Sequence, residues 1–428
     1  MSFKHSALAC AVGAFASAFC ASAAQAQSAA DFEQLRQELK RLKEEMQNLK
    51  VQKAPAPAVD AAAINDRVEQ LEIKSKDAVV AGDIGGGLRI PGSETSVHLY
   101  GYAEAHLVHD LKAPGPSDLF TDLSFQPLDS ADVPHGRTRL TASTSRLGLE
   151  TSTPTSTGTF NTRLEMDFYS YGDGNRNRLR LRHAYGEYHG FLVGQTWSTF
   201  MDLDDLPETV DFNGPIGAPF SRRTMIRYTY GDPRAGYKLT VALEDPQDQF
   251  GGGSQAERLP QFVARFDKSF DWGAINMRGL VHEKRSATET RRGYGVGIGG
   301  SYKLSDKDLL MAQYTRVDGD IDQLYGSNGY AIDGTTGTIS FDRNRGFVAG
   351  YNRNFSDSLR GTVAFGMNKG KTAAAIDNRS LRQLFVNLIY SPIKNVELGG
   401  EYVHGRRETF TGEVGTMSRI DLMGRYSF

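Results

Sequence analysis

The chain of 428 residues lacks several features that would point to common protein classes. Its only cysteines are Cys10 and Cys20, so the rest of the sequence excludes disulfides, thiolate metal sites and cysteine nucleophiles. Charge of neither sign dominates, with 49 basic and 51 acidic residues, which argues against a nucleic-acid binder. Long hydrophobic runs are missing beyond the N-terminus, and the mean hydropathy of −0.42 rules out a bundle of membrane-spanning helices. Composition alone is therefore typical of a large soluble protein.

The N-terminus predicts export. Residues 1–26 carry an early Lys4, a short apolar run, and the small residues Ala24 and Ala26 at the −3 and −1 positions of a cleavage site. We interpret this segment as a signal peptide, and both cysteines lie inside it. A retained membrane anchor is the alternative, which the short apolar run disfavours.

Residues 27–81 predict a coiled-coil stalk. Apolar residues recur at alternating spacings of three and four, with charged residues between them: Phe32, Leu35, Leu39, Leu42, Met46 and Leu49. Pro55 and Pro57 interrupt the pattern, and a weaker seam resumes at residues 61–78. An amphipathic helix lying on its own domain is the alternative. Glycines and Pro91 mark residues 82–95 as a linker.

From residue 96 to residue 428 the sequence alternates with a period of two. In the segment 160–168, for example, Phe160, Leu164 and Phe168 share one face, and Arg163 and Glu165 lie on the other. Turn signals divide this region by seven short connections and eight long ones, which implies sixteen strands. The predicted fold is all-β: a 16-stranded antiparallel transmembrane β-barrel, preceded by a periplasmic coiled-coil helix. A soluble sandwich or propeller would not need this strict alternation of short and long connections.

The last strand supports a barrel of the outer membrane. Ile420, Leu422, Gly424, Tyr426 and Phe428 alternate with polar residues, and the chain stops at the phenylalanine. Tyr426 and Phe428 match the terminal signal by which the barrel-assembly machinery recognises its substrates. Closing the sheet also removes the exposed strand edges that an exported sheet would otherwise present.

Three segments carry a family resemblance that covers nearly the whole mature chain. They are IPGSETSVHLYGY (Ile90 to Tyr102), SRLGLE (Ser145 to Glu150) and the long GQTWSTFMDLDDLPETVDFNGP (Gly194 to Pro215). With these segments and its N-terminal coiled coil, the sequence resembles the DcaP-like outer-membrane porins. The resemblance implies a homotrimer of sixteen-stranded barrels with a periplasmic coiled coil, which passes small anions such as dicarboxylates.

Arginines are the candidate pore-lining residues. Between residues 137 and 227 there are eleven arginines and no lysine. Guanidinium groups stay charged and bind carboxylates in two-pronged fashion. By strand parity Arg163, Arg223 and Arg227 face the lumen, and Arg146 joins them, whereas His183 and Glu187 leave the parity of Arg180 and Arg182 open. The alternative, compatible with a pore role, is that these arginines pair with acids such as Glu165 and Asp167 to hold the wall rigid.

The third long connection, residues 199–221, is the candidate constriction loop. It is acidic and has no basic residue, and its acids are Asp202, Asp204, Asp205, Glu208 and Asp211. In porins of sixteen strands the third loop folds into the barrel, so we predict that this loop narrows the pore and faces the arginine wall. A loop held outside the barrel is the alternative.

The remaining motifs predict no chemistry. Gly295 to Gly300 fits a nucleotide-binding pattern, but it lies inside an alternating strand, where glycines let the wall approach a loop closely. We expect no cofactor, no metal and no enzyme activity. The predicted function is passive diffusion of small anionic solutes across the outer membrane of a Gram-negative bacterium, with outer-membrane lipid as a further partner. The alternatives are an outer-membrane barrel enzyme of the lipase or protease type, and a structural envelope protein anchored through its coiled coil.

Overall fold

The computed structural model describes residues 34, 36–48, 65–70, 80–117, 120–169, 178–232, 234–246, 248, 257–372 and 378–428. Residues 36–48 and 65–70 are helical, and an ion pair of 3.7 Å joins Arg67 to Glu38. Of the predicted coiled-coil positions, Leu39, Leu42, Met46 and Val68 lie in these helices, and the others fall outside the described residues. The predicted signal peptide also lies outside them. Among the described helices, none is both long and apolar enough to cross a membrane.

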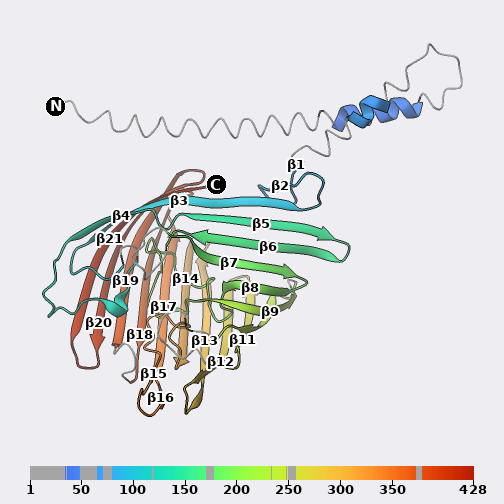
Figure 1. Cartoon of the computed structure of the whole chain (residues 1–428). Helices are drawn as coiled ribbons and strands as arrows, with labels where there is room; N and C mark the ends of the chain where they lie inside the picture. The colour runs from blue at the N-terminus through green and yellow to red at the C-terminus, as the bar shows by residue number, and fades with distance from the viewer. Residues whose placement is uncertain are drawn as a thin grey trace, which may run out of the picture. The chain divides into compact units, whose positions relative to one another are not determined.

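Strands make up most of the described chain (Figure 1). The first seven strands are β1 (Val80–Ala81), β2 (Leu88–Arg89), β3 (Ser96–Asp110), β4 (Arg137–Thr141), β5 (Arg146–Thr155), β6 (Gly158–Asp167) and β7 (Arg180–Tyr188). The next seven are β8 (Phe191–Trp197), β9 (Arg222–Asp232), β10 (Tyr237–Glu244), β11 (Gln261–Phe270), β12 (Gly273–Arg285), β13 (Thr290–Ser305) and β14 (Asp308–Asp318). The last seven are β15 (Tyr330–Ile332), β16 (Ile339–Phe341), β17 (Arg343–Asn354), β18 (Leu359–Lys369), β19 (Asn378–Ile393), β20 (Val396–Thr409) and β21 (Val414–Ser427). One 3-10 turn, η1 (Leu123–Phe125), lies between β3 and β4.

The strands from β3 to β21 close into a 16-stranded antiparallel barrel, which confirms the predicted fold class. In this count β4 and β5 are two parts of one strand, interrupted at residues 142–145, and β15 and β16 form a separate hairpin. The barrel closes where β21 pairs with β3. Beside this seam, Gly101 and Phe428 exchange backbone hydrogen bonds of 3.0 and 3.2 Å. Closure therefore satisfies the backbone groups of both edge strands, as a membrane environment requires.

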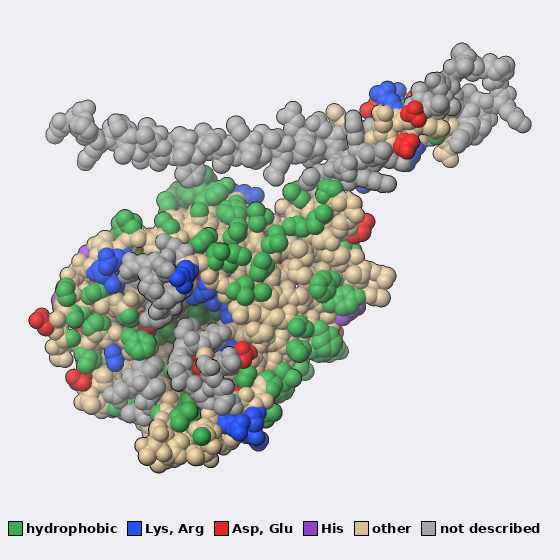
Figure 2. All heavy atoms as spheres, in the orientation of Figure 1, with side chains coloured by type: hydrophobic (Ala, Val, Ile, Leu, Met, Phe, Trp, Pro, Cys, Tyr) green, Lys and Arg blue, Asp and Glu red, His purple; other side chains and the backbone are tan. Residues whose placement is uncertain are grey.

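Alternation along each strand separates a lipid-facing side from an inner side. On β19, Leu384, Val386 and Leu388 are exposed, whereas Gln383 and Asn387 are buried inside the barrel. Figure 2 shows hydrophobic side chains spread over the visible surface, with charged side chains in separate groups. This arrangement explains the low hydropathy, because a strand needs apolar residues at only every second position to face lipid.

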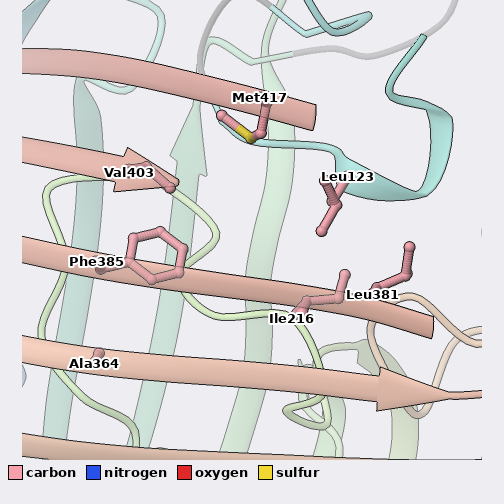
Figure 3. Packing of buried hydrophobic residues seen from close by; sticks show 7 residues of the cluster. All are labelled: Leu123, Ile216, Ala364, Leu381, Phe385, Val403 and Met417. Carbon is pink, nitrogen blue, oxygen red and sulfur yellow. The ribbon is translucent and has the colours of Figure 1, made fainter. Parts of the chain in front are cut away.

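Three long loops contribute apolar side chains to the interior. Leu123 of the first loop and Ile216 of the third loop pack against inward side chains of β18 to β21, including Phe385 and Met417 (Figure 3). Phe200 of the third loop and Leu324 of the sixth loop (319–342) share a second cluster with the wall. Each buried Leu, Ile or Phe stabilises such packing by about 1.5–3 kcal/mol. The sequence predicted an inward position for the third loop alone.

Candidate pore and its inner wall

The third long loop, called L3 below (residues 198–221), begins against β11 and β12. The side-chain nitrogen Nδ2 of Asn276 donates hydrogen bonds of 2.7 Å to both Asp202 and Asp205. Arg265 lies 3.4 Å from Asp202. Gly299 on β13 faces the same point, and a Cβ there would lie 2.1 Å from the Asp202 carboxylate. The expectation that glycines of this strand let a loop approach the wall is therefore confirmed.

The middle and end of L3 continue along the same side of the barrel. Arg360 on β18 donates two hydrogen bonds of 2.8 Å to Glu208. Glu401 on β20 accepts the backbone N–H groups of Val210 and Asp211 at 2.9 and 2.8 Å. Farther along, the backbone N–H of Ile216 donates to Gln383 on β19 at 2.9 Å. L3 thus lies inside the barrel and is attached to strands β11 to β20.

The acidic side chains of L3 do not face the predicted arginine wall, so this part of the prediction is wrong. Asp202 and Asp205 bind Arg265 and Asn276, and Glu208 binds Arg360, on strands that the parity argument had not connected to the loop. The Asp211 carboxylate accepts the backbone N–H of Thr121 at 2.7 Å. Asp204 alone keeps an open side chain, 77% exposed, 3.4 Å from Arg265. The acids of L3 serve mainly to attach the loop.

The Asp202–Asp205 pair predicts a pH dependence of stability. Burial and the neighbouring Asp202 raise the pKa of Asp205 to about 7. Between about pH 4 and about pH 7 the folded chain therefore holds a proton that the unfolded chain has released, and its stabilising effect is lost as pH rises through this range. We expect Asp205→Asn to reduce the difference in apparent melting temperature between about pH 5 and about pH 8.

Heat-dependent gel mobility measures this melting. The exposed Asp204→Asn is the control: the Asp204 carboxylate contributes less to the raised pKa of Asp205 than burial and Asp202 do, so this variant should keep most of the wild-type pH dependence. An unchanged pH dependence in Asp205→Asn would contradict the assignment.

Four of the predicted arginines gather around two inner carboxylates. Arg182 donates to Glu165 and to Asp167, at 2.8 Å in both cases. Arg146 and Arg163 lie 3.4 and 3.2 Å from Glu165. Arg180 lies 2.6 Å from Asp167. The pairing of these arginines with Glu165 and Asp167, given above as the alternative role, is therefore present.

Pairing does not bury the whole cluster. The side chains of Arg163, Arg180 and Arg146 are 34%, 29% and 22% exposed, whereas that of Arg182 is only 5% exposed. Tyr100 and Tyr102 of β3 lie under the guanidinium groups of Arg163 and Arg146, at 5.1 and 5.0 Å. Three arginines are thus held firmly by acids and rings while part of each guanidinium-bearing side chain stays accessible.

A β-bulge explains why the parity of β7 could not be assigned. The register between β6 and β7 runs from Glu165↔His183 to Met166↔Leu181, so Arg182 is an extra residue on β7. A bulge lets two successive side chains point to one face. Arg182 and His183 are both buried inside, and Arg180 also lies on the inner side.

The two predicted arginines of β9 differ from each other. Arg223 is 1% exposed and donates to Asp322 of the sixth loop at 2.9 Å, so it attaches that loop and does not line an open passage. Arg227 is half-buried on the inner side. Within the described residues its guanidinium has no ion pair or hydrogen bond.

Sequence parity missed other charged residues of the inner wall. Arg222 lies over the ring of Trp197 at 4.0 Å, a ring that Arg182 also approaches at 5.6 Å. Arg425 on β21 lies 3.1 Å from Glu397, which in turn lies 2.6 Å from Arg360. The inward position of Arg425 can be predicted from the sequence, because Arg425 stands between Gly424 and Tyr426, which belong to the outward face of this strand. The local sequence pattern does not identify Arg222 as an inner-wall residue, because Arg222 is the first residue of β9 and alternation cannot be read across the strand boundary.

Tyr426 and Phe428 lie at the closing seam of the barrel. Both are exposed on the lipid-facing side, at 39% and 50%. Tyr426 pairs with Ala103 of β3 and with Val396 of β20. This placement is compatible with the predicted assembly signal, which stays a prediction. Among the described residues, no group of three or more His, Cys, Asp or Glu side chains could hold a metal ion.

A closed barrel of sixteen antiparallel strands with inward-folded loops defines the class of outer-membrane porins. The chain belongs to the DcaP outer membrane protein family, because the sequence model of this family matches residues 85–428. Among solved structures it is similar to the outer membrane channel DcaP of Acinetobacter baumannii, with 32% identity, a TM-score of 0.70, and coverage of 78% of this chain and 97% of that chain.

More distant porins share the fold. An anion-selective porin from Comamonas acidovorans has 12% identity and a TM-score of 0.53, with 78% of this chain and 100% of that chain covered. OmpF of Salmonella typhi has 14% identity and a TM-score of 0.52, with 78% and 98% covered. No curated protein sequence matches the chain.

Proposed function

We propose that this outer-membrane channel lets small hydrophilic anions diffuse across the membrane, with a preference for dicarboxylate-like solutes. The observation that carries the proposal is the arginine cluster on β5, β6 and β7. With the adjacent Arg222, five guanidinium groups gather at Glu165 and Asp167, and the formal charges of these seven side chains sum to +3.

The accessible arginines suit transient binding of a carboxylate. Arg146 and Arg163 both lie at Glu165, the carboxylate that Arg182 also binds, so three guanidinium groups share one carboxylate. A wall of one sign of charge sets the sign of the ions that pass. Planar guanidinium groups also bind carboxylates in two-pronged fashion, which favours solutes that carry two such groups.

L3 also contacts the arginine cluster. The ring of Phe212 lies 5.7 Å from the guanidinium of Arg180 and 5.8 Å from that of Arg182. The acids of L3 are engaged with the far wall, so the loop presents an aromatic ring at this point. In this proposal the arginines and the ring of Phe212 beside them border the narrow region together.

The sequence and the family support a proposal for the assembly. We propose a homotrimer with residues 27–81 as a periplasmic stalk, after removal of residues 1–26 as a signal peptide. The alternating apolar seam of residues 32–49 supports the stalk. A trimer form of OmpT from Vibrio cholerae, 13% identical, shows that this fold can assemble in threes.

The double variant Arg163→Ala, Arg227→Ala tests the anion preference. Reconstituted in a planar bilayer under a salt gradient, it should show a reversal potential closer to zero, with the anion-to-cation permeability ratio reduced about threefold to tenfold. The estimate follows because a charge about 8 Å from a passing ion contributes roughly 0.5 kcal/mol in water, so two such charges contribute roughly 1 kcal/mol. Lys307→Ala with Lys394→Ala, two exposed positions in short turns, is the matched control. An unchanged reversal potential and unchanged dicarboxylate block would refute the proposal.

A further inference from the structure

Basic side chains face outward in a row at the long-loop end of β14, β17 and β18. Arg316 is paired directly opposite Arg345, and Arg345 directly opposite Lys369. Like charges directly opposite on neighbouring strands are destabilising. Within the described chain, the side chains of Arg345 and Lys369 make no ion pair or hydrogen bond, and both are exposed. An anion bound from outside the chain would reduce the repulsion between these positive charges.

The row stands at the edge of the apolar band. One step toward the middle of the barrel on the same outward face, Tyr314 pairs with Phe347 and Phe347 pairs with Met367. The change from apolar to basic side chains therefore occurs within two residues of each strand. This is the level at which lipid chains end and headgroups begin.

A pocket next to the row concentrates more positive charge. A cavity of about 350 Å³ is lined by Arg291, Arg292, Arg343 and Lys371, with Asp318 as its carboxylate. Asp318 is already shared, because it lies 3.3 Å from Arg343 and 3.3 Å from Arg316. The row and the pocket together present seven basic side chains and one acid.

On the next two strands the outward face stays basic. Arg382 on β19 is paired directly opposite Arg406 on β20, and both are exposed. The two exposed arginines repeat the like-charge pairing seen on β14 to β18. The basic surface thus extends around five neighbouring strands, which is wider than a single small anion would require.

We propose that this surface binds the phosphorylated headgroup of a glycolipid in the outer leaflet of the outer membrane. Porins turn their long loops outward, so the row lies at the headgroups of that leaflet. Phosphate groups accept several charge-assisted hydrogen bonds from arginine and lysine, and the pocket offers four such donors around one cavity. The aliphatic chains of the same lipid then contact Tyr314, Phe347 and Met367 below.

The test compares binding of purified bis-phosphorylated lipid A and its dephosphorylated form to the full chain in detergent micelles. In the variant Arg316→Gln, Arg345→Gln, Lys369→Gln we expect affinity for phosphorylated lipid A to fall about 100-fold, or about fivefold for each charge near an anionic surface. The variant Arg234→Gln, Lys307→Gln, Lys394→Gln removes the same charge from exposed short turns and should bind like the wild type.

Three results would overturn the proposal: equal binding of the two lipid forms by the wild type, unchanged affinity in the triple variant, or equally strong displacement of the lipid by inorganic phosphate. The last result would assign the surface to a small anion. Conductance and ion preference of the triple variant in a planar bilayer should equal those of the wild type, which shows that the barrel is folded.

Discussion

Replacing Arg146 and Arg163 with glutamate should invert the ion preference of the channel. The two substitutions change the summed charge of the arginine cluster, with Glu165 and Asp167, from +3 to −1. Both side chains are partly exposed, so the reversal acts on the passage itself and does not place two new charges in a closed core. We expect the anion-to-cation permeability ratio to fall about 100-fold, since charged walls change local ion concentrations by about 10 to 10³.

Reversal potentials in a planar bilayer measure this change. Lys307→Glu with Lys394→Glu adds the same negative charge at exposed short turns and should keep the anion preference. A second variant, Arg146→Gln with Arg163→Gln, should lie between the wild type and the reversed channel, because it removes charge without adding acid. A channel that stays anion-selective with glutamate at both positions would show that ions pass elsewhere.

Local periodicity was sufficient to predict the barrel. Alternation and turn residues predict sixteen strands and the order of short and long connections, and the strand bounds agree with them. Both features depend on neighbouring residues, so they can be recognised without knowledge of distant contacts. For the same reason the inward positions of Arg163 and Arg227 follow from parity.

Long-range and irregular features were not predictable in this way. The parity of Arg182 failed because a bulge adds one residue to β7, and nothing in the adjacent sequence fixes where the register slips. Arg223 lies on the expected face, yet its partner Asp322 is 99 residues away in a loop with no sign of an inward path. The acids of L3 were expected to face the arginines because both are charged, whereas their partners depend on how the loop is attached to β11 through β20.

The attachment of L3 to the wall predicts a second large effect, at Gly346 on β17. A Cβ at this position would lie 2.1 Å from the carbonyl oxygen of Gly217 in L3 and 2.6 Å from Leu324 of the sixth loop. We expect Gly346→Val to displace both loops, at a cost of about 1–3 kcal/mol or more, as is typical of overpacking. Strand β17 is held in place by hydrogen bonds to β14 and β18. The added side chain therefore displaces the two loops toward the passage.

The displaced loops should lower the single-channel conductance of Gly346→Val and make it fluctuate more. Gly400→Val is the matched control, because a Cβ there meets only Leu422, at 3.5 Å, and the position faces lipid. It should fold and conduct like the wild type. If Gly346→Val conducts normally, L3 does not narrow the passage beside β17; if it fails to fold, Gly346→Ala, with its smaller side chain, provides the same comparison. Strand β17 is not a neighbour of β5, β6 or β7 in the sheet, so the Gly346→Val channel should keep the ion preference of the wild type while its conductance falls. This combination distinguishes loop displacement from loss of charge.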